Sequence, residues 1–420
     1  SFKNNMISTS LRFIFWLFIT AYFVPTTSSA QVFNFFSNKE PETPRQMLLS
    51  DRAIQLGTND AINNMYNFNF YEAEKDFKWL TVKYPNHPIG HFLLGLNEWW
   101  KIVPDLKVTR YDETCHEYMD LAIKKAEDLY DEDSRDKEAA FFLAAAYAFK
   151  GRLYSEREKW VKAAWAGKQA MKYLDRSRGE VQINPELIFG DGLYNYYSKW
   201  IHETYPSLKP LLTFFKKGDK KLGIKQLENV ANNAFYTRME ARYFLVQIYS
   251  MEGQHTKALI MARTMHSLYP NNAFFHRFAA RESFVLSQFD EAERYANELL
   301  ARVQAQSYGY GPTDGRYASY ILGFINEKYR LNKIQARLYY QDTIRYSLLN
   351  KSEDSGYALA AHLALGSLDE ERQDCVSARQ HYERVVQESE KNSVYYTKGK
   401  AALKELDKKT KQVRGQRKSR

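Results

Sequence analysis

The segment HTKALIMARTMHSLYPNN, residues 255–272, and the segment FDEAERYANELLARVQ, residues 289–304, share one spacing of small and large side chains. Each has an alanine, a second alanine four positions later, and a large apolar residue three positions after that. These residues are Ala258, Ala262 and Met265 in the first segment and Ala292, Ala296 and Leu299 in the second, 34 positions further on. A second amphipathic segment precedes each copy, so the spacing predicts an array of helix pairs.

The same pattern recurs along most of the chain. A small residue on one segment is followed about twelve positions later by an alanine on the next, and large apolar residues follow that alanine. Five regular units have their small residue at Ala61, Val246, Ala280, Gly323 and Gly366. Three irregular units, with insertions or weaker matches, have it at Gly95, Ala144 and Gly192. Small side chains at these points allow two helices to approach closely while larger neighbours fill the remaining space.

This pattern resembles the tetratricopeptide repeat (TPR) family, in which each repeat is a 34-residue helix–turn–helix. The resemblance implies an all-α fold, a right-handed α-solenoid of about eight TPR-like helix pairs with a C-terminal capping helix, since repeat arrays must cover their open end. The expected organisation is a signal peptide at 1–30, a flexible leader at 31–47, one solenoid domain at 48–406 and a basic tail at 407–420. Within the solenoid, we expect irregular repeats at 88–235, regular repeats at 239–391 and the capping helix at 393–406.

The first thirty residues have the features of an export signal. Arg12 precedes an apolar run at 13–24, and the small residues Ser28 and Ala30 suit cleavage by signal peptidase before Gln31. A membrane anchor is the alternative, but a helix of this run would span roughly 18 Å against a hydrocarbon core of ~30 Å. We therefore expect an exported TPR protein of the bacterial envelope type, located in the periplasm or associated with the outer membrane.

The net charge of +10 over 420 residues sits mainly at the two ends of the chain. The segment 404–420 has eight basic and two acidic residues, and the first thirty residues contribute Lys3 and Arg12. The body is nearly neutral, so no nucleic-acid partner is expected. The basic tail either is a solvated helix end or binds an anionic membrane surface.

The chain has two cysteines, Cys115 and Cys375, which lie 260 positions apart. In an extended repeat array such positions would be far apart in space. We therefore expect two unpaired, buried thiols and a fold that is stabilised by burial instead of cross-links.

Candidate binding residues come from the resemblance, which implies that the first helix of each pair lines a concave groove. If the small residue is position 8 of a unit, positions 2, 5, 9, 12 and 13 tend to face this groove. The candidates are Trp99, Trp100, Phe149, Tyr196, Tyr197, Tyr243, Gln247, Arg277, Arg281, Tyr320 and Phe324. Any one of these rings could instead belong to the core.

Two arrangements among these candidates favour the groove. Neighbouring helical residues point about 100° apart, so at least one ring of the Trp99–Trp100 pair is expected at an edge or in the groove. Arg277 and Arg281 lie one turn apart on one helical face, where they could clamp a carboxylate of a partner. They could equally be solvated, or paired with acidic residues such as Glu282.

No motif for catalysis, metal binding or cofactor binding is found in the sequence. HEYMD, which contains His116, lacks the second histidine of a zinc-protease helix. DEDSRDKE, which begins at Asp131, lacks the glycine of a calcium loop. GYGPTDG, which begins at Gly309, follows no predicted strand and so does not suit a phosphate-binding loop. We expect no enzymatic activity, no metal and no cofactor.

The sequence therefore favours a non-enzymatic exported TPR scaffold that binds a protein partner or peptide segment of the cell envelope in its concave groove. The alternative is a glycan-binding outer-membrane accessory protein that uses the groove aromatics as flat sugar platforms. The absence of a cysteine near the predicted cleavage point, where a lipid anchor would be attached, counts against this alternative.

Overall fold

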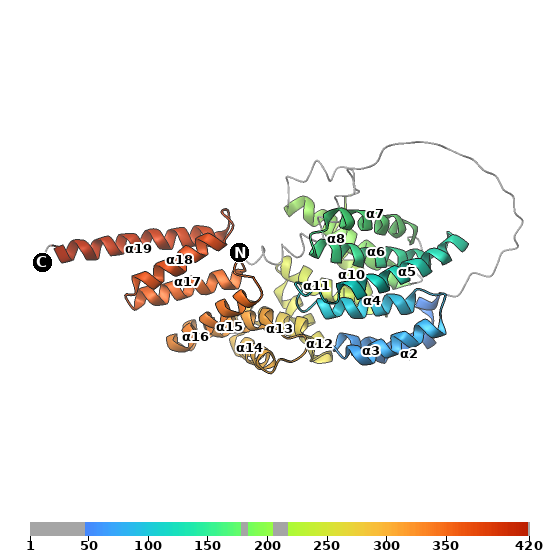
Figure 1. Cartoon of the computed structure of the whole chain (residues 1–420), viewed down its shortest axis with the longest axis horizontal. Helices are drawn as coiled ribbons and strands as arrows, with labels where there is room; N and C mark the ends of the chain where they lie inside the picture. Colours follow the sequence, from blue (N-terminus) through green and yellow to red (C-terminus); the bar gives the residue numbers. More distant parts are fainter. Residues whose placement is uncertain (1–46, 178–183, 205–216, 419–420) are drawn as a thin grey trace, which may run out of the picture.

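The computed structural model describes residues 47–177, 184–204 and 217–418, which are almost wholly helical (Figure 1). These residues form seventeen α-helices and two short 3-10 helices, and no strand occurs among them. The prediction of an all-α fold is confirmed. The predicted signal peptide and nearly all of the predicted leader fall outside the described residues.

The helices form eight consecutive pairs and one terminal helix, and, apart from α7 and α8, each packs mainly against the helices before and after it. The N-terminal pairs are α2 (Arg52–Tyr66) with α3 (Phe70–Lys83), α4 (Ile89–Ile102) with α5 (Asp112–Glu132), α6 (Lys137–Glu156) with α7 (Trp160–Ser177), and α8 (Phe189–Thr204) with α10 (Lys220–Asn233). The C-terminal pairs are α11 (Arg238–Met251) with α12 (His255–Leu268), α13 (Ala273–Val285) with α14 (Phe289–Gln304), α15 (Pro312–Lys328) with α16 (Lys333–Leu349), and α17 (Gly356–Glu371) with α18 (Cys375–Glu388). The 3-10 helices η2 (Leu48–Ser50) and η3 (Pro185–Ile188) precede α2 and α8, and α19 (Val394–Lys418) packs on α18. The predicted solenoid of about eight helix pairs is confirmed.

Close approach of the paired helices depends on the predicted small residues. A Cβ atom added to Gly366 on α17 would lie 2.4 Å from Cε1 of Tyr382 on α18. A Cβ atom at Gly223 on α10 would lie 2.5 Å from the backbone nitrogen of Tyr196 on α8. Neither position has space for a side chain: at Gly223 the helix backbones touch, and at Gly366 the ring of Tyr382 fills the space.

A repeated backbone conformation marks the turn inside six of the pairs. In each of these turns, the residue two positions before the second helix has a positive φ. These residues are Phe68, Glu158, Gly253, Ser287, Leu331 and Gln373, with φ values of 65°, 57°, 73°, 59°, 54° and 62°. This left-handed conformation costs a non-glycine residue about 1–2 kcal/mol, so the packing of the two helices must hold the turn in place.

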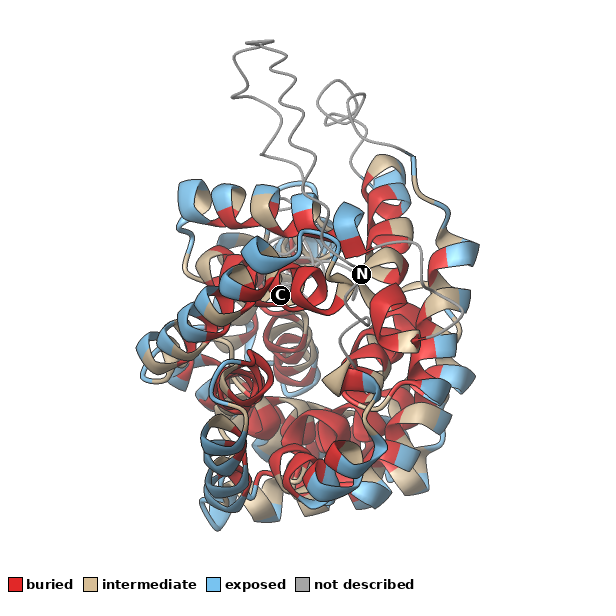
Figure 2. Cartoon of the chain, turned by 90° about the vertical axis from the view of Figure 1, so that its right-hand side faces the viewer, coloured by how far each residue is buried: buried red, intermediate tan, exposed pale blue. Residues whose placement is uncertain are grey.

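The array curls until its first pair touches its middle, a feature that the repeat pattern does not predict. The hydroxyl of Tyr269, after α12, donates to Oδ1 of Asn63 on α2 at 2.8 Å. The amide nitrogen of Asn272 donates to the backbone oxygen of Tyr66 at 2.9 Å. Viewed end-on, the helices carry buried residues on the sides that face one another and exposed residues on the outside (Figure 2).

The C-terminal helix α19 is longer than the predicted capping helix. It continues past the expected end at Leu406 to Lys418, and it projects beyond α17 and α18 (Figure 1). Leu406 is buried, Asp407 forms an ion pair with Arg379 on α18, and Lys409 lies 2.8 Å from a carboxylate oxygen of Glu370 on α17. The start of the predicted basic tail is therefore part of the capping helix.

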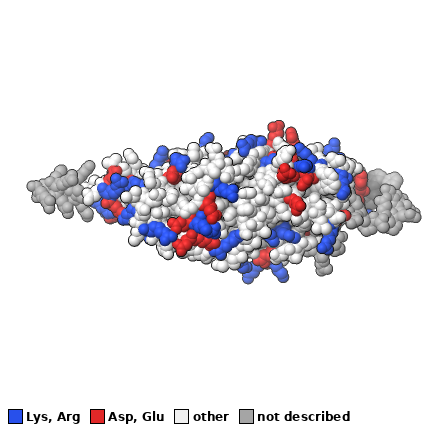
Figure 3. Space-filling model, turned by 90° about the horizontal axis from the view of Figure 1, so that it is seen from below, with Lys and Arg blue, Asp and Glu red and all other residues white. Residues whose placement is uncertain are grey.

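Both cysteines are free, as predicted, and Cys115 is buried. The prediction that Cys375 is buried is wrong, because this residue begins α18 at the solvent-exposed turn after α17. On the face drawn in Figure 3, acidic and basic side chains are interspersed, which agrees with a nearly neutral body. Among the described residues, no helix is both long enough and apolar enough to cross a bilayer.

Candidate binding groove

A groove of about 820 Å³ lies on the inner side of the curled array. Its wall is formed by the first helices α11, α13, α15 and α17 of four successive pairs, by the α4–α5 connection and by the start of α19. The aromatic and arginine side chains that line it include Tyr243, Phe274, Arg277, Phe278, Arg281, Arg316, Tyr317, Tyr357 and Tyr395. The implied role of the first helices as the concave wall is therefore found in this part of the chain.

The α4–α5 connection reaches across the groove to the C-terminal half. Nζ of Lys107 donates to the backbone oxygens of Asn350 and Lys351 and, at 3.0 Å, to the hydroxyl of Ser352. Burial of this ammonium group lowers the pKa of Lys107. Because these acceptors lie in the α16–α17 connection, the insertion joins two distant repeats and closes one side of the groove.

The predicted arginine pair lines the groove, but its charges are bound within the protein. The guanidinium of Arg277 forms an ion pair with Asp314, whose other oxygen accepts from the backbone nitrogen of Gly311 at 2.9 Å. Nη1 of Arg281 donates to Glu282 at 2.7 Å and to the hydroxyl of Ser250 at 2.9 Å. The sequence left three possibilities for these arginines: a clamp for a partner carboxylate, exposure to solvent, or pairing with acidic residues of the chain. The structure shows the pairing.

Arg316, near the start of α15, differs from these two arginines. It lines the groove and is 8% exposed, yet its Nε has no hydrogen-bond partner among the described residues. Its only hydrogen bond to a described residue, from Nη1 to Oδ1 of Asn350, is long at 3.4 Å. If the side-chain amide of Asn350 is turned over, its nitrogen donates to the backbone oxygens of Tyr346 and Ser347 and to the hydroxyl of Ser352. In this orientation the contact with Arg316 is lost. Burial and the neighbouring Arg277 lower the pKa of the Arg316 guanidinium, whereas the charges of Asp105 and Asp354 in the groove wall act in the opposite direction. Among the described residues no carboxylate is close enough to form an ion pair with it, so the guanidinium keeps unused hydrogen-bonding capacity in the groove wall.

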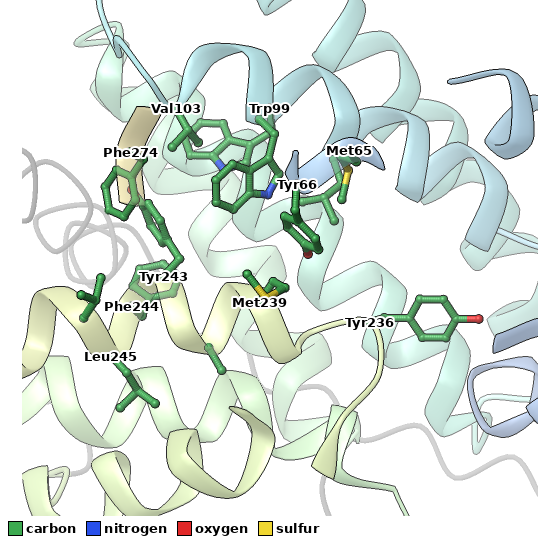
Figure 4. Packing of buried hydrophobic residues seen from close by; sticks show 14 of the residues in the cluster. Met65, Tyr66, Trp99, Val103, Tyr236, Met239, Tyr243, Phe244, Leu245 and Phe274 are labelled. Atoms are coloured by element: carbon green, nitrogen blue, oxygen red, sulfur yellow. The ribbon is translucent and has the colours of Figure 1, made fainter. Parts of the chain in front are cut away.

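Four predicted rings lie in the core. Trp99, Trp100, Tyr196 and Tyr197 are each at most 2% exposed. The expectation that one ring of the tryptophan pair reaches the groove is wrong, because α4 is covered on several sides once the array curls. Nε1 of Trp100 donates to Glu240 on α11 at 2.7 Å, and Trp99 lies in the same packed layer as Tyr243 (Figure 4).

The other candidates divide between the groove and the contacts of neighbouring helices. Tyr243 and Gln247 line the groove, and the side-chain amide of Gln247 donates to the backbone oxygen of Tyr243 at 2.9 Å. Phe149 is half-buried, with its ring centroid 5.8 Å from that of Trp99. Tyr320 and Phe324 are half-buried, and both pack edge-on against Phe284. Of the eleven candidates, the groove thus brings together Tyr243, Gln247, Arg277 and Arg281.

Some groove residues were missed by the sequence analysis. Phe274 and Tyr317 occupy position 2 of their units, so strict use of the positional rule would have found them. Arg316 occupies position 1, outside that rule, and Lys107 lies in an insertion. These two could not be found from the repeat pattern.

Comparison with known proteins adds little to this description. No protein-family model and no curated protein match the sequence. Among solved structures, yeast Tom70 is similar with a TM-score of 0.38 and 11% identity, over 85% of this chain and 82% of that one. The TPR domain of P58(IPK) is similar with a TM-score of 0.26 and 11% identity, over 86% of this chain and 99% of that one. Such values carry no argument about function, and the TPR-like α-solenoid fold is defined by the helix pairs of the chain itself.

Proposed function

We propose that this protein is a non-catalytic scaffold whose groove holds an extended, acidic segment of a partner protein. The observation that carries the proposal is Arg316, a buried guanidinium in the groove wall with an unbonded Nε. A side-chain or terminal carboxylate of the partner would accept from this guanidinium, with a charge-assisted bond stronger than one between neutral groups.

The size and the apolar lining of the groove suit a peptide segment. Five acidic residues also line the groove, so the carboxylate of the occupant is expected to lie at Arg316; they are Asp105, Glu156, Asp354, Glu388 and Glu390. Its volume of about 820 Å³ falls within the range of about 300–1,000 Å³ that is common for binding clefts. Phe274, Tyr317 and Tyr395 supply apolar contact area next to the arginines, a combination that is frequent at the centre of protein interfaces. Four of the rings proposed as sugar platforms in the glycan alternative are buried in the core, which supports the peptide over the sugar; they are Trp99, Trp100, Tyr196 and Tyr197.

The proposal includes the location expected from the sequence. The partner would belong to the cell envelope, reached after export and cleavage between Ala30 and Gln31. The basic end of α19 would hold the scaffold close to an anionic membrane surface. N-terminal sequencing of protein isolated from the envelope tests the export step: a first residue at Gln31 is expected, and retention of residues 13–24 contradicts it.

Binding of peptides to the purified protein tests the groove directly. We expect acidic peptides from an unbiased peptide library to bind and their neutral amide counterparts to bind at least tenfold more weakly. Arg316→Gln should remove most of this preference, since a hydrogen bond to a charged group contributes about 1.5–3 kcal/mol. The matched control is Arg345→Gln, which alters an exposed arginine on α16 that does not line the groove.

A photo-crosslinking residue locates the bound segment. At Gln247, which lines the groove, it should form adducts with acidic peptides and with the same protein partners in envelope extracts. At Val161, which is 84% exposed on α7 and lies outside the groove, it should not. Equal labelling at both positions, or a preference for basic peptides that Arg316→Gln leaves unchanged, contradicts the proposed function.

A further inference from the structure

Two histidines and a glutamate from three successive helices meet on the side of α13 away from the groove. His266 lies on α12, His276 on α13 and Glu298 on α14. One potential ligand atom from each of the three lies within 4.8 Å of the others. His276 follows His266 by 10 positions, and Glu298 follows His276 by 22 positions. These spacings match no local metal-binding motif, and the three residues meet only because the repeats pack together.

The two imidazole rings have nitrogens with no hydrogen-bond partner. The rings stack with their centroids 4.2 Å apart and an interplanar angle of 18°. Nδ1 of His266 and Nε2 of His276 are both buried and form no hydrogen bond with the described residues. His276 itself is only 2% exposed. Buried polar atoms without a partner are uncommon in folded proteins, so two on adjacent rings call for an explanation.

The surroundings of His276 accommodate the tautomer that a metal ligand requires. Nδ1 of His276 lies 3.1 Å from the hydroxyl oxygen of Tyr310, and this hydroxyl donates to the backbone oxygen of Pro270 at 3.3 Å. The metal-binding form of His276 is the tautomer in which Nδ1 donates to the Tyr310 hydroxyl, because Nε2 then carries the lone pair. A hydrogen bond from the other ring nitrogen to an oxygen is typical of metal-binding histidines.

Glu298 offers one oxygen to the same point. Its Oε2 lies 3.6 Å from Nε2 of His276, whereas its Oε1 accepts from Nη1 of Arg294 at 2.8 Å. The carboxylate can therefore face the histidines with one oxygen while the other keeps its bond to the arginine. The side chain of Glu298 is 43% exposed, so the cluster is accessible from solvent.

We propose that His266, His276 and Glu298 form a binding site for a divalent transition metal, with Zn²⁺ as the best-fitting ion and water as the fourth ligand. Imidazole donors favour Zn²⁺, Cu²⁺ or Ni²⁺ over Mg²⁺ and Ca²⁺. Two histidines, one carboxylate and an open position form a common tetrahedral zinc donor set. Donors at zinc–nitrogen distances of about 2.0–2.1 Å lie roughly 3.3 Å apart, so the side chains of His266 and Glu298 must move inward by about 1–1.5 Å.

The electrostatics of the cluster are compatible with this assignment. Burial is the largest cause that lowers the pKa of His276 to about 2, and the neighbouring His266 and Arg302 lower it further, while the backbone of Tyr295 acts in the opposite direction. Arg294 and Arg302 place positive charge beside the cluster, and the bond of Arg294 to Glu298 offsets part of it.

A bound ion would link α12, α13 and α14 and thereby hold two consecutive repeats together. Arg277 is the next residue after His276 on α13 and points into the groove, so the ion would also fix the orientation of the helix that carries this arginine. This role is independent of what the groove binds.

The test uses purified protein without a polyhistidine tag. Zn²⁺ is titrated by isothermal calorimetry, and Co²⁺ is added as a spectroscopic probe of tetrahedral coordination. We expect one ion per chain with a dissociation constant in the micromolar range or below, a d–d absorption band with Co²⁺, and a rise in Tm on addition of Zn²⁺. His266→Gln and Glu298→Gln should each weaken this binding at least tenfold, and both change half-buried or exposed side chains, so the fold should be retained.

Two control variants separate this cluster from other histidines. His91→Gln removes another imidazole whose Nδ1 is buried without a partner, and His381→Gln breaks the second histidine pair, in which the Nδ1 atoms of His362 and His381 are 2.8 Å apart. Both variants should bind Zn²⁺ like the unaltered protein. Absence of binding below about 100 µM Zn²⁺, or binding that His266→Gln and Glu298→Gln leave unchanged, overturns the proposal.

Discussion

Replacement of Glu240 by glutamine should remove a pH dependence from the stability of the protein. The carboxyl group of Glu240 is fully buried on α11, where it accepts from Nε1 of Trp100 at 2.7 Å and from the hydroxyl of Tyr66 at 3.3 Å. Burial is the main cause that raises the pKa of Glu240 from 4.5 to about 7, and the two donated hydrogen bonds partly oppose this shift. The folded protein therefore keeps a proton that the unfolded chain has already released.

The sign and size of the effect follow from these two pKa values. Between pH 4.5 and pH 7 the native state binds more protons than the unfolded state, so the free energy of unfolding falls as the pH rises. The stabilisation by protonated Glu240 is fully present below about pH 4.5 and is lost above about pH 7. Between pH 5 and pH 8 the loss amounts to about 2.5 kcal/mol.

Urea unfolding, followed by circular dichroism at constant ionic strength from pH 5 to pH 8, measures this loss. Glu240→Gln keeps an oxygen for both donors but does not titrate. The unaltered protein should therefore lose about 2.5 kcal/mol from its free energy of unfolding between pH 5 and pH 8 through Glu240, and the variant should not show this loss. Glu72→Gln, at an exposed position on α3, is the control and should follow the unaltered protein throughout. A constant difference between Glu240→Gln and the unaltered protein at all pH values would refute the reasoning.

Three further predictions concern the repeats and the C-terminal helix. Ser287→Gly should raise the free energy of unfolding by about 0.5–1 kcal/mol in urea, because φ at this turn is 59°, and a fall would mean that the serine side chain stabilises the turn. Gly366→Ala should lower it by about 1–3 kcal/mol, since the added Cβ would lie 2.4 Å from the facing tyrosine ring; an unchanged urea midpoint would show that α17 and α18 can separate freely. Deletion of residues 412–420 should leave Tm unchanged but reduce co-sedimentation with anionic vesicles at low salt. Deletion of residues 404–420 should in addition lower Tm by several degrees because it removes a buried leucine, and equal Tm values for both deletions would contradict this.

The features that could be predicted from the sequence are those encoded within about 34 residues. The alternation of small and large residues in segments such as 255–272 gives the helix pairs, their number and their contact points. It does not give the curl, because the bonds of Asn63 and Tyr66 to residues beyond α12 join positions more than 200 apart. Contacts with the distant helices α11 and α13 bury Trp100, and Trp99 packs on Phe149 of α6. The positional rule therefore assigned to the groove two rings that belong to the core.

The Arg316 site and the proposed metal site could not be predicted from the sequence for a similar reason. Arg316 becomes distinctive only when the structure shows that carboxylates form direct ion pairs with Arg277 and Arg281, whereas the Nε of Arg316 has no hydrogen-bond partner among the described residues. His266 and His276 lie on adjacent helices, and the spacing of ten residues between them matches no common ligand motif. At both sites, the ability to bind a ligand depends on side chains that lack a hydrogen-bond or ion-pair partner within the fold. A repeat pattern does not show which side chains lack such a partner.

The contact between the first helix pair and the middle of the array has a consequence for synthesis of the chain. A linear solenoid can fold as it emerges, since each repeat needs only its neighbour. Here the partners of Tyr66, in the region of Asn272, are made about 200 residues later. At about 5–20 residues per second, this is a delay of roughly 10–40 s. During most of this interval Trp100 on α4 lacks its neighbours Tyr243 on α11 and Phe275 on α13, so this face of α4 is open to misassembly or to capture by a chaperone.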